Sequence, residues 1–378
     1  MTTSAEPANG APAPAIEPLL DRRLVICVGA GGVGKTTTAA ALGIAAALRG
    51  RRTAVITVDS ARRPRDALGL AGLSDEPQPV PLEAGAAPLV AMALDTKRTF
   101  DRLIARSPRP RGRRAHLRQP LYQELPASLQ WFAEYMAMER LHELLTLGHY
   151  DLLVVDTPPS TDLRALLGAP RRLLELLASH AARILRAPRS IVGAETGPTR
   201  LAVMAVLKAL ERWTGVDVLR ELSDFTAAFE QLLEGFRVRA EQTGTALRAS
   251  DTAFTVVTTA EPRAIAVCRE LGAQLQRDGY PLAGIIANRV YRFPLLDPEA
   301  AAWAPASLRA KLLACYGDFV ALSQRDAAAL AALAAQTRVP LLGVVPMLVD
   351  APTSIATLRA VVAHLTGARA LSPAAEAL

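Results

Sequence analysis

The sequence predicts a doubly wound α/β fold, in which a mostly parallel β-sheet with helices on its faces carries an additional helical subdomain. Three observations lead to this prediction: short β-branched apolar runs recur, helical patterns separate most of them, and two intervals between them are long. Apolar runs without polar alternation indicate strands buried on both faces, as in a parallel sheet with right-handed crossovers. The runs are Leu24–Gly29, Thr53–Asp59, Leu89–Asp95, Asp151–Asp156, Ala253–Ala260, Leu282–Val290 and Pro340–Pro346.

Length, composition and cysteine usage limit the class of protein. The chain has 378 residues, of which 51% are hydrophobic and only 4% aromatic, a balance typical of a helix-rich globular protein with a sizeable core. Its three cysteines, Cys27, Cys268 and Cys315, form no CxxC pair, so neither a disulfide framework nor a compact zinc knuckle is expected. This usage favours a reducing compartment, and we expect a cytoplasmic protein.

The net charge of +7 at first suggests a nucleic-acid partner. Nearly all basic residues are arginines, however, and together with abundant Ala, Pro and Gly this bias is more typical of a GC-rich genome than of a DNA-binding surface. We therefore expect no nucleic-acid binding. The Arg-rich segment 106–118 is interpreted as a solvated loop, with DNA or membrane-surface contact as the alternative.

The ends of the chain and its two long intervals define the expected domain organisation. Residues 1–20 lack the charged and apolar regions of a signal peptide and are expected to form a disordered tail, as are residues 367–378. Residues 21–366 are expected to form one domain without internal repeats and without an apolar run long enough to span a membrane. Insertions at about 96–150 and 161–250 supply the helical subdomain.

Both insertions carry helical patterns. The first contains the stretch LQWFAEYMAMERLHELL, and the second shows no strand signal. Within the second, apolar residues recur at i, i+4, i+7 and i+11, which is the spacing of one helical face. These residues are Phe225, Phe229, Leu232 and Phe236.

A glycine-rich loop joins the first predicted strand to a helix. The segment GAGGVGKT, from Gly29 to Thr36, satisfies the pattern GxxxxGK[ST] in the strand–loop–helix context that a phosphate-binding loop requires. Its backbone N–H groups converge on phosphate oxygens, Lys35 neutralises their charge, and the Thr36 hydroxyl is a ligand for Mg²⁺. The predicted nucleotide-binding residues here are Gly29, Gly31, Gly32, Val33, Gly34, Lys35, Thr36 and Thr37.

Two aspartates end buried strands at the edge of the sheet where the phosphates are expected. Asp59 follows TAVITV and Asp156 follows DLLVV. A carboxylate in this position can hold Mg²⁺ through water or orient the water that attacks the γ-phosphate. The competing interpretation, a helix N-cap or a surface position, is preferred only for Asp66 and Asp162.

Polar and turn residues also follow the last two predicted strands. IIANRV places Asn288 at a strand end, and VVPMLVD places Pro346, Met347 and Leu348 just past another. An Asn amide offers both a donor and an acceptor to an adenine edge, and a Pro-Met-Leu turn can cover the base.

These motifs, in this order, resemble the ArsA/Get-type ATPases. The resemblance is carried by VGAGGVGKTTT, DSARRPRDALGL, DTPPSTDLRALL, IANRV and VVPML, and it spans roughly Leu24 to Leu365. The phrases LDTKRTFD, EYMAMERLHELL and VVDTPPS are similar to the single-unit bacterial branch. The resemblance implies a SIMIBI-like P-loop NTPase with a deviant Walker A motif, which acts as a dimeric, Mg-ATP-driven switch with nucleotide sites facing each other.

The resemblance also implies roles for individual residues. Asp59 would lie in the first switch and position the attacking water, and Asp156 would begin the second switch and sense the water shell of Mg²⁺. Asn288 and the turn Pro346–Leu348 would hold adenine. ATP and Mg²⁺ are therefore the expected cofactors.

The chain departs from the family at several positions. The usual loop reads KGGxGKT, and its first lysine reaches the phosphates of the partner subunit, but Ala30 stands in that position here. The interfacial zinc CxxC, the arsenite-sensing cysteines and a Met-rich client-binding insert are not evident, which argues against an arsenite-pump ATPase.

Ala30 leaves several interpretations open. We place first a heterodimer in which a lysine-bearing paralogue completes the ATP site. The alternatives are a slow homodimer, substitution by an arginine of the first switch, and a nucleotide-holding subunit that hardly hydrolyses. A targeting chaperone for hydrophobic segments, with a groove formed by Trp131–Leu145 and Leu201–Phe236, is a further alternative. The candidate arginines are Arg62, Arg63 and Arg65.

Overall fold

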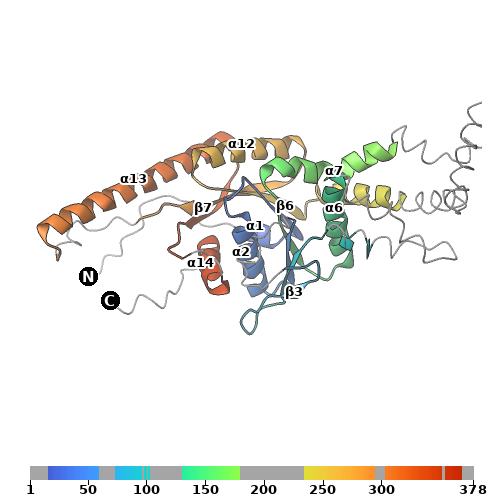
Figure 1. Ribbon diagram of the computed structural model, residues 1–378, viewed down its shortest axis with the longest axis horizontal. Coiled ribbons are helices and arrows are strands. Elements are labelled where there is room, and N and C mark those ends of the chain that lie inside the picture. Colours follow the sequence, from blue (N-terminus) through green and yellow to red (C-terminus); the bar gives the residue numbers. More distant parts are fainter. Residues whose placement is uncertain are drawn as a thin grey trace, which may run out of the picture. The chain divides into compact units, whose positions relative to one another are not determined.

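The chain divides into two compact units. The first consists of Met1–Leu94, Leu147–Leu163 and Leu247–Leu378, and the second of Asp95–Thr146 and Arg164–Ala246. The first unit contains the β-sheet (Figure 1). The computed structural model describes residues 16–58, 73–95, 98–99, 101–102, 130–178, 234–293, 303–350 and 354–367.

The first unit is built on an eight-stranded sheet in the order β3-β4-β2-β5-β1-β6-β7-β8. Every neighbouring pair is parallel except β3 and β4. The predicted mostly parallel sheet is therefore confirmed. Each predicted apolar run contains one of its strands, except that β6 begins at Thr252, one residue before its run. The strands are β1 (Leu24–Val28), β2 (Thr53–Thr57), β3 (Gln78–Pro79), β4 (Leu89–Ala93), β5 (Leu152–Asp156), β6 (Thr252–Thr258), β7 (Leu282–Val290) and β8 (Leu341–Pro346).

The sequence patterns did not indicate β3. This strand has only two residues and pairs antiparallel with β4 at one edge of the sheet. A strand of two residues is too short to show a sequence periodicity. Its Pro79 is tolerated because β3 is an edge strand, where a residue without a backbone N–H removes no hydrogen bond of the sheet.

The parallel register brings the carboxyl ends of three central strands to the same level. Cys27 of β1 and Thr57 of β2 are both paired with Asp156 of β5. Every residue of these strands is buried, which explains their unbroken apolar sequences. The loops that follow them therefore leave the sheet at one edge, where ligands bind in open α/β sheets.

Helices cover both faces of the sheet, as predicted for a doubly wound fold. α2 (Lys35–Leu48) packs against α14 (Ile355–Thr366), against the short α1 (Glu17–Leu20) and against the strands at the centre of the sheet. α12 (Pro262–Arg277) and α13 (Ala306–Thr337) lie on the other side of the strands in Figure 1.

α2 lies unusually close to the sheet because its buried side chains are small. Seven of its residues are alanine or glycine in the run KTTTAAALGIAAAL, and nearly all of them are fully buried. A Cβ placed on Gly43 would lie only 2.4 Å from Cγ2 of Val55 in β2. The close packing of α2 against the sheet fixes the position of its first turn, which directly follows the phosphate loop.

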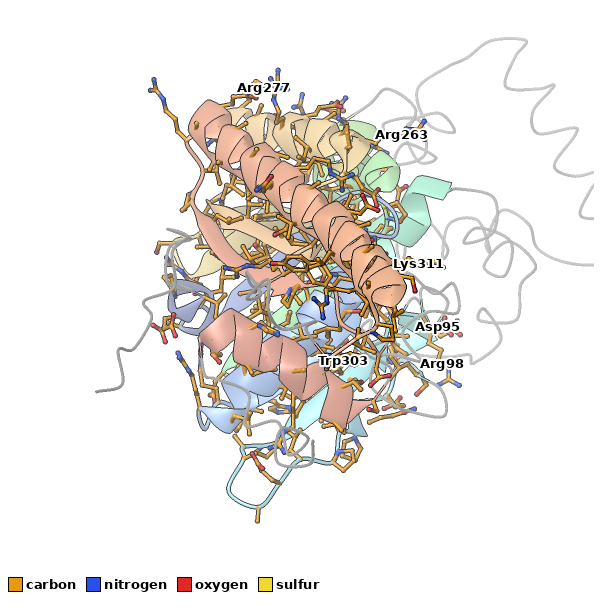
Figure 2. The ribbon with its side chains drawn as sticks, turned by 90° about the vertical axis from the view of Figure 1, so that its left-hand side faces the viewer. Asp95, Arg98, Arg263, Arg277, Trp303 and Lys311 are labelled. Atoms are coloured by element: carbon orange, nitrogen blue, oxygen red, sulfur yellow. The ribbon has the colours of Figure 1, made fainter. Side chains whose placement is uncertain are left out.

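α13 spans 32 residues, a length that the sequence patterns did not indicate. It begins after Pro305, and its last third packs against α12, with Leu330 and Leu333 buried. Most side chains in its first two thirds are exposed. Figure 2 looks onto the beginning of this helix, where Trp303 and Lys311 are labelled.

The described part of the second unit is largely helical. It includes most of α6 (Gln130–Leu147) and α7 (Ser160–Ala178), together with helical residues 234–246. Helix is thus found where LQWFAEYMAMERLHELL predicts it and in most of the described part of 161–250. Phe236 is buried. Three other predicted members of its helical face lie outside the described residues: Phe225, Phe229 and Leu232.

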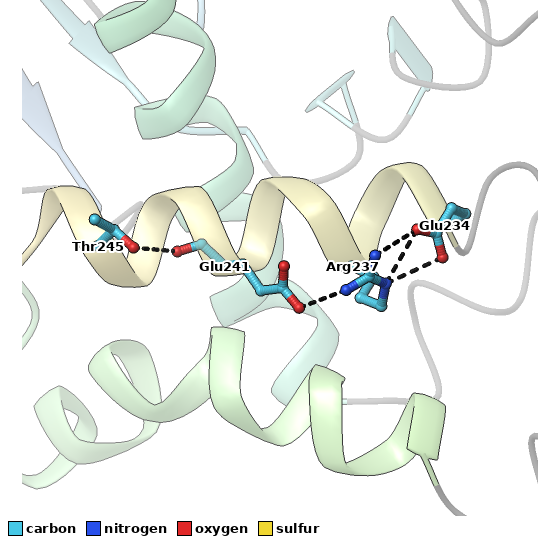
Figure 3. Close-up of polar contacts among 4 residues, drawn as sticks. All are labelled: Glu234, Arg237, Glu241 and Thr245. Atoms are coloured by element: carbon cyan, nitrogen blue, oxygen red, sulfur yellow. Dashed lines mark hydrogen bonds and ion pairs between the residues drawn. The ribbon is translucent and has the colours of Figure 1, made fainter.

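Ion pairs along the surface of the 234–246 helix support its helical conformation. Arg237 forms ion pairs of 2.6 Å with both Glu234 and Glu241, which are one turn away on either side (Figure 3). The Thr245 hydroxyl donates to the Glu241 carbonyl oxygen at 3.0 Å. Pairs at i+3 and i+4 spacing favour helix modestly. Across the described ranges, no helix combines the length and the apolar composition needed to cross a membrane.

Candidate functional site

The loop between β1 and α2 has the shape of a phosphate cradle. Gly32 and Gly34 adopt left-handed conformations, with φ of 78° and 96°. Gly34 is the N-cap of α2, so the first N–H groups of the helix are available to a ligand at the loop. Packing also requires glycine here, because a Cβ on Gly34 would lie 2.0 Å from Nδ2 of Asn288, and one on Gly29 would lie 2.2 Å from the Val257 carbonyl oxygen.

Lys35 is held directly over this loop. The side chain is only 7% exposed, and its Nζ donates to the carbonyl oxygens of Gly29 at 3.1 Å and Ala30 at 2.9 Å. A buried ammonium group requires such partners. The same position places one positive charge beside the helix N-terminus, where it can neutralise phosphate oxygens.

Thr36 and Asp156 bring together the oxygen ligands expected of a magnesium site. The Thr36 hydroxyl donates to Oδ2 of Asp156 at 2.6 Å, and the Thr57 hydroxyl donates to the same oxygen at 3.3 Å. Asp156 is 2% exposed at the end of β5. Hydroxyl and carboxylate oxygens next to a phosphate cradle are the donors that Mg²⁺ prefers, so the residues fit this ion.

Burial and the carboxylate of Asp156 both affect the pKa of Cys27 in the neighbouring strand β1. Burial raises the pKa of the Cys27 thiol well above its usual range, and the carboxylate of Asp156 raises it further. Cys27 is therefore a neutral, buried core residue. Its carbonyl oxygen accepts a 2.8 Å hydrogen bond from the Thr157 hydroxyl, which ties the start of the segment after β5 to β1.

The segment after Asp156 passes beside the phosphate loop. A Cβ placed on Gly31 would be in ordinary contact, 3.9 Å, with Cβ of Pro159. The predicted second switch therefore begins within contact distance of the phosphate loop.

Asn288 and Arg289 reach the loop from the end of β7. Nδ2 of Asn288 donates to the Val33 carbonyl oxygen at 3.0 Å, and the residue is 6% exposed. The Arg289 guanidinium donates to the Gly32 carbonyl oxygen at 2.8 Å, and its backbone has a left-handed φ of 55°. Sequence reasoning singled out Asn288 and missed Arg289, although a charged residue directly after the strand-end asparagine was a usable signal.

The turn Pro346–Leu348 is adjacent to the end of β7. Pro346 pairs with Val290, and the backbone N–H of Met347 donates to the Val290 carbonyl oxygen at 2.9 Å. Met347 is partly exposed. Asn288 and the Pro-Met-Leu turn, which are far apart in sequence, therefore lie on neighbouring strand ends.

Several predicted residues lie outside the described residues. One of them is Asp59. β2 ends at Thr57, and residue 58 is the last described residue of this segment. The Arg-rich segment 106–118 and residues 201–233 of the predicted client groove are also outside it. The same is true of the candidate substitute arginines Arg62, Arg63 and Arg65.

Comparison with known proteins agrees with this geometry. The model of the anion-transporting ATPase family matches residues 22–300. An uncharacterized protein of Streptomyces coelicolor is 34% identical over 202 residues, which are 50% of this chain and 48% of that protein. A protein of Mycobacterium tuberculosis is 31% identical over 50% of this chain and 46% of its own length.

A relative with a named activity is more distant. The ATPase GET3 of Malassezia globosa is 29% identical over 154 residues, which are 39% of this chain and 43% of that protein. The chain thus spans about half the length, or slightly less, of each of these curated relatives.

Proposed function

The chain belongs to the anion-transporting ATPase family, and on this premise we propose that it is a Mg-ATP-binding and hydrolysing switch that acts as a dimer in the cytoplasm. The single observation that best supports the proposal is the cluster of Lys35, Thr36 and Asp156 at the phosphate loop. Hydrogen bonds of 2.6–3.1 Å hold the Lys35 ammonium group against the loop and the Thr36 hydroxyl against Asp156. A charge that can neutralise phosphates and oxygen atoms that can bind Mg²⁺ therefore lie at the same loop.

Each residue of the site has a distinct proposed task. The glycines of the loop bind the phosphates through backbone N–H groups, and Lys35 neutralises the charge of the β- and γ-phosphates. Thr36 would hold Mg²⁺ directly, and Asp156 would hold it through a water molecule. When bound, Mg²⁺ supplies charge neutralisation at the phosphates. We assign to Asp59 the orientation of the attacking water.

Binding of the base is proposed to involve the two neighbouring strand ends. Asn288 offers its amide to the adenine edge, and Pro346, Met347 and Leu348 cover the ring. Support comes from the short distance between Asn288 and the phosphate loop, which fixes the amide.

Ala30 supports the proposal that the active dimer is a heterodimer with a lysine-bearing paralogue. The Ala30 side chain brings no charge to the loop, and a cation supplied by a partner accelerates phosphoryl transfer by ~10³–10⁵ in other systems. A second candidate rests on a separate observation. Arg289 contacts the loop at Gly32 from the same chain and is positioned to supply the charge instead.

The nucleotide state is proposed to be coupled to a protein client or partner through the helical unit. The nucleotide site and the helices are covalently connected, because the segment that begins at Asp156 leads directly into α7. A slow, nucleotide-holding subunit and a targeting chaperone for hydrophobic segments remain the alternatives. The lack of the family's arsenite-sensing cysteines argues against an arsenite-pump ATPase.

Turnover of Mg-ATP by the purified chain tests the proposal. The variants to compare with the wild type are Lys35→Ala, Ala30→Lys and Arg289→Gln. If a partner supplies the missing cation, the wild type is near the Lys35→Ala background and Ala30→Lys raises turnover at least tenfold.

Other outcomes separate the alternatives. An active wild type that Arg289→Gln inactivates, and that Ala30→Lys barely changes, identifies Arg289 as the cation and removes the need for a partner. Nucleotide binding without turnover in the wild type, Ala30→Lys and Arg289→Gln, measured by fluorescence of a labelled nucleotide, contradicts hydrolysis and leaves the nucleotide-holding alternative.

A further inference from the structure

The exposed part of α13 carries an apolar stripe along one helical face. Leu308, Leu312, Cys315, Phe319 and Leu322 follow one another at spacings of four and three residues, the repeat of a coiled-coil seam. Leu308 is 42% exposed and Leu312 39% exposed, and Cys315 and Phe319 are exposed as well. A stripe with this spacing over roughly 21 Å, at ~1.5 Å per residue, is longer than isolated surface leucines explain.

The same stripe is buried farther along the helix. Its continuation through Asp326 and Leu333 packs against the body of the unit, and Oδ2 of Asp326 accepts the Tyr291 backbone N–H at 3.0 Å. Phe293, which follows β7, packs against Phe319 with ring centroids 4.6 Å apart. The exposed stripe is therefore anchored at its C-terminal end and is presented on a stable helix.

We propose that the α13 seam, defined as Leu308, Leu312, Cys315, Phe319 and Leu322, binds the α13 seam of a second copy of this chain in antiparallel orientation. Antiparallel pairing about a point midway between Leu312 and Cys315 places Leu308 against Phe319 of the second copy. It also places Leu312 beside Cys315 of the second copy. Leu308, Leu312, Cys315 and Phe319 each gain an apolar partner in this way.

Charge complementarity selects the second copy and the orientation. Lys311 and Asp318 lie one heptad apart on the same flank of the seam. Antiparallel pairing brings these equivalent flanks together, so Lys311 of each copy faces Asp318 of the other. Parallel pairing would instead place Lys311 opposite Tyr316, without a matching charge.

Trp303 extends the seam at its N-terminal end. Two residues before the helix N-cap Pro305, it is 76% exposed, and Figure 2 shows it at the beginning of α13. In the antiparallel pair it lies beside Leu322 of the second copy. A tryptophan at each end of a small apolar interface is the kind of residue that dominates binding energy.

This interface does not rest on the proposed ATPase function. The seam lies on α13, whereas the nucleotide site is formed at the phosphate loop by the ends of β1, β5 and β7. Self-association through the seam is therefore expected without nucleotide, and it is expected to be the same in the Lys35→Ala variant. Failure of either proposal is recognisable separately.

Sedimentation velocity of the full chain without nucleotide, over a range of concentrations, tests the interface. Leu312 and Leu313 form a matched pair, because they are neighbours with 39% and 41% exposure but only Leu312 belongs to the seam. We expect Leu312→Asp to weaken self-association at least tenfold and Leu313→Asp to leave it unchanged. A monomeric wild type, or a dimer that Leu312→Asp leaves intact, overturns the proposal.

Charge reversal tests the pairing of the flanks. Lys311→Asp and Asp318→Lys are each expected to weaken self-association several-fold, because each places like charges opposite one another. The double variant restores opposite charges and is expected to recover the wild-type affinity. Additive losses in the double variant contradict the Lys311–Asp318 pairing and overturn the antiparallel register.

Disulfide trapping tests the orientation. On a Cys315→Ser background, chains with Lys311→Cys and chains with Asp318→Cys are expected to cross-link when mixed, but not when each is oxidised alone. Gln324→Cys, on the opposite face of α13, is the control that should not cross-link. Cross-linking of each chain with itself contradicts the antiparallel register, and absence of cross-linking indicates another occupant, such as an apolar segment of a client. Either result overturns the proposal.

Discussion

Glycines at the phosphate loop are required for two reasons, the conformation of the backbone and the packing of neighbouring side chains. Gly32 and Gly34 both have positive φ, so either position is strained for an alanine. They differ in their surroundings: among the described residues, a Cβ on Gly32 meets nothing within 4 Å, whereas one on Gly34 meets Nδ2 of Asn288 at 2.0 Å. The two glycines therefore separate backbone strain from the packing of Asn288 against the loop.

Gly32→Ala and Gly34→Ala are predicted to differ in stability. Gly32→Ala is expected to lower the free energy of unfolding by about 1–2 kcal/mol, because alanine is strained in the left-handed conformation of this residue. Gly34→Ala adds a steric term of about 1–3 kcal/mol because the Asn288 amide must move. Chemical denaturation of the two variants measures the difference. Equal losses would show that Asn288 is not held against the loop as described.

At the scale of elements, α6 and the 234–246 helix are joined by a buried polar cluster. The Tyr135 hydroxyl lies 2.8 Å from Oε2 of Glu139 and 3.1 Å from the Phe236 carbonyl oxygen, and Glu139 pairs with Arg239. The rings of Tyr135 and Phe236 pack edge to face at 5.4 Å. Burial raises the pKa of Glu139 above its usual value, while Arg239 and the Tyr135 hydroxyl lower it.

Tyr135→Phe is predicted to destabilise the helical unit in a pH-dependent way. Loss of the hydroxyl removes a hydrogen bond to a buried carboxylate and is expected to cost about 1–3 kcal/mol at neutral pH. The Glu139 pKa then rises further above its unfolded value. A carboxyl group whose pKa is higher in the folded than in the unfolded state stabilises the fold at low pH, and this stabilisation is lost as pH rises through the folded-state pKa. The loss of stability caused by Tyr135→Phe is therefore largest when Glu139 is ionised.

Thermal unfolding of this variant at neutral and mildly acidic pH checks the prediction. The control is Tyr291→Phe, a tyrosine outside the cluster whose substitution removes no contact with Glu139. A penalty that stays constant with pH would mean that the Tyr135 hydroxyl stabilises the helices through the Phe236 carbonyl alone.

At the scale of the whole molecule, the proposed nucleotide site consists of three regions that are distant in sequence. The phosphate loop follows β1, Asp156 ends β5, and Asn288 lies near the end of β7. A ligand that binds all three is expected to stabilise the sheet unit as a whole, because it binds only where these regions are assembled.

Mg-ADP is predicted to raise the unfolding temperature of the unit that contains the sheet. At a concentration of 100 times Kd the stabilisation is about 2.7 kcal/mol. Lys35→Ala removes most of this shift, and chelation of Mg²⁺ removes part of it, because Thr36 and Asp156 then lose their ligand. Differential scanning calorimetry measures the shift; a shift of equal size in Lys35→Ala would locate binding elsewhere.

Local sequence determined the family of this protein and the types of its described elements. Continuous apolar runs identified every strand of the described residues except the two-residue β3, because a buried strand is recognisable from adjacent residues alone. The loop from Gly29 to Thr36 predicts a phosphate site for the same reason. Asp156 and Asn288 were singled out because they are polar residues at or near the end of an apolar run.

Only the tertiary structure decided how these parts meet and what α13 presents. The contacts of Asn288 with Val33 and of Arg289 with Gly32 join residues more than 250 positions apart, and no local pattern encodes such a pairing. The exposed stripe of α13 has the same residue types as a core-facing stripe. Sequence alone cannot distinguish the two, because burial depends on whether other elements of the fold cover that face.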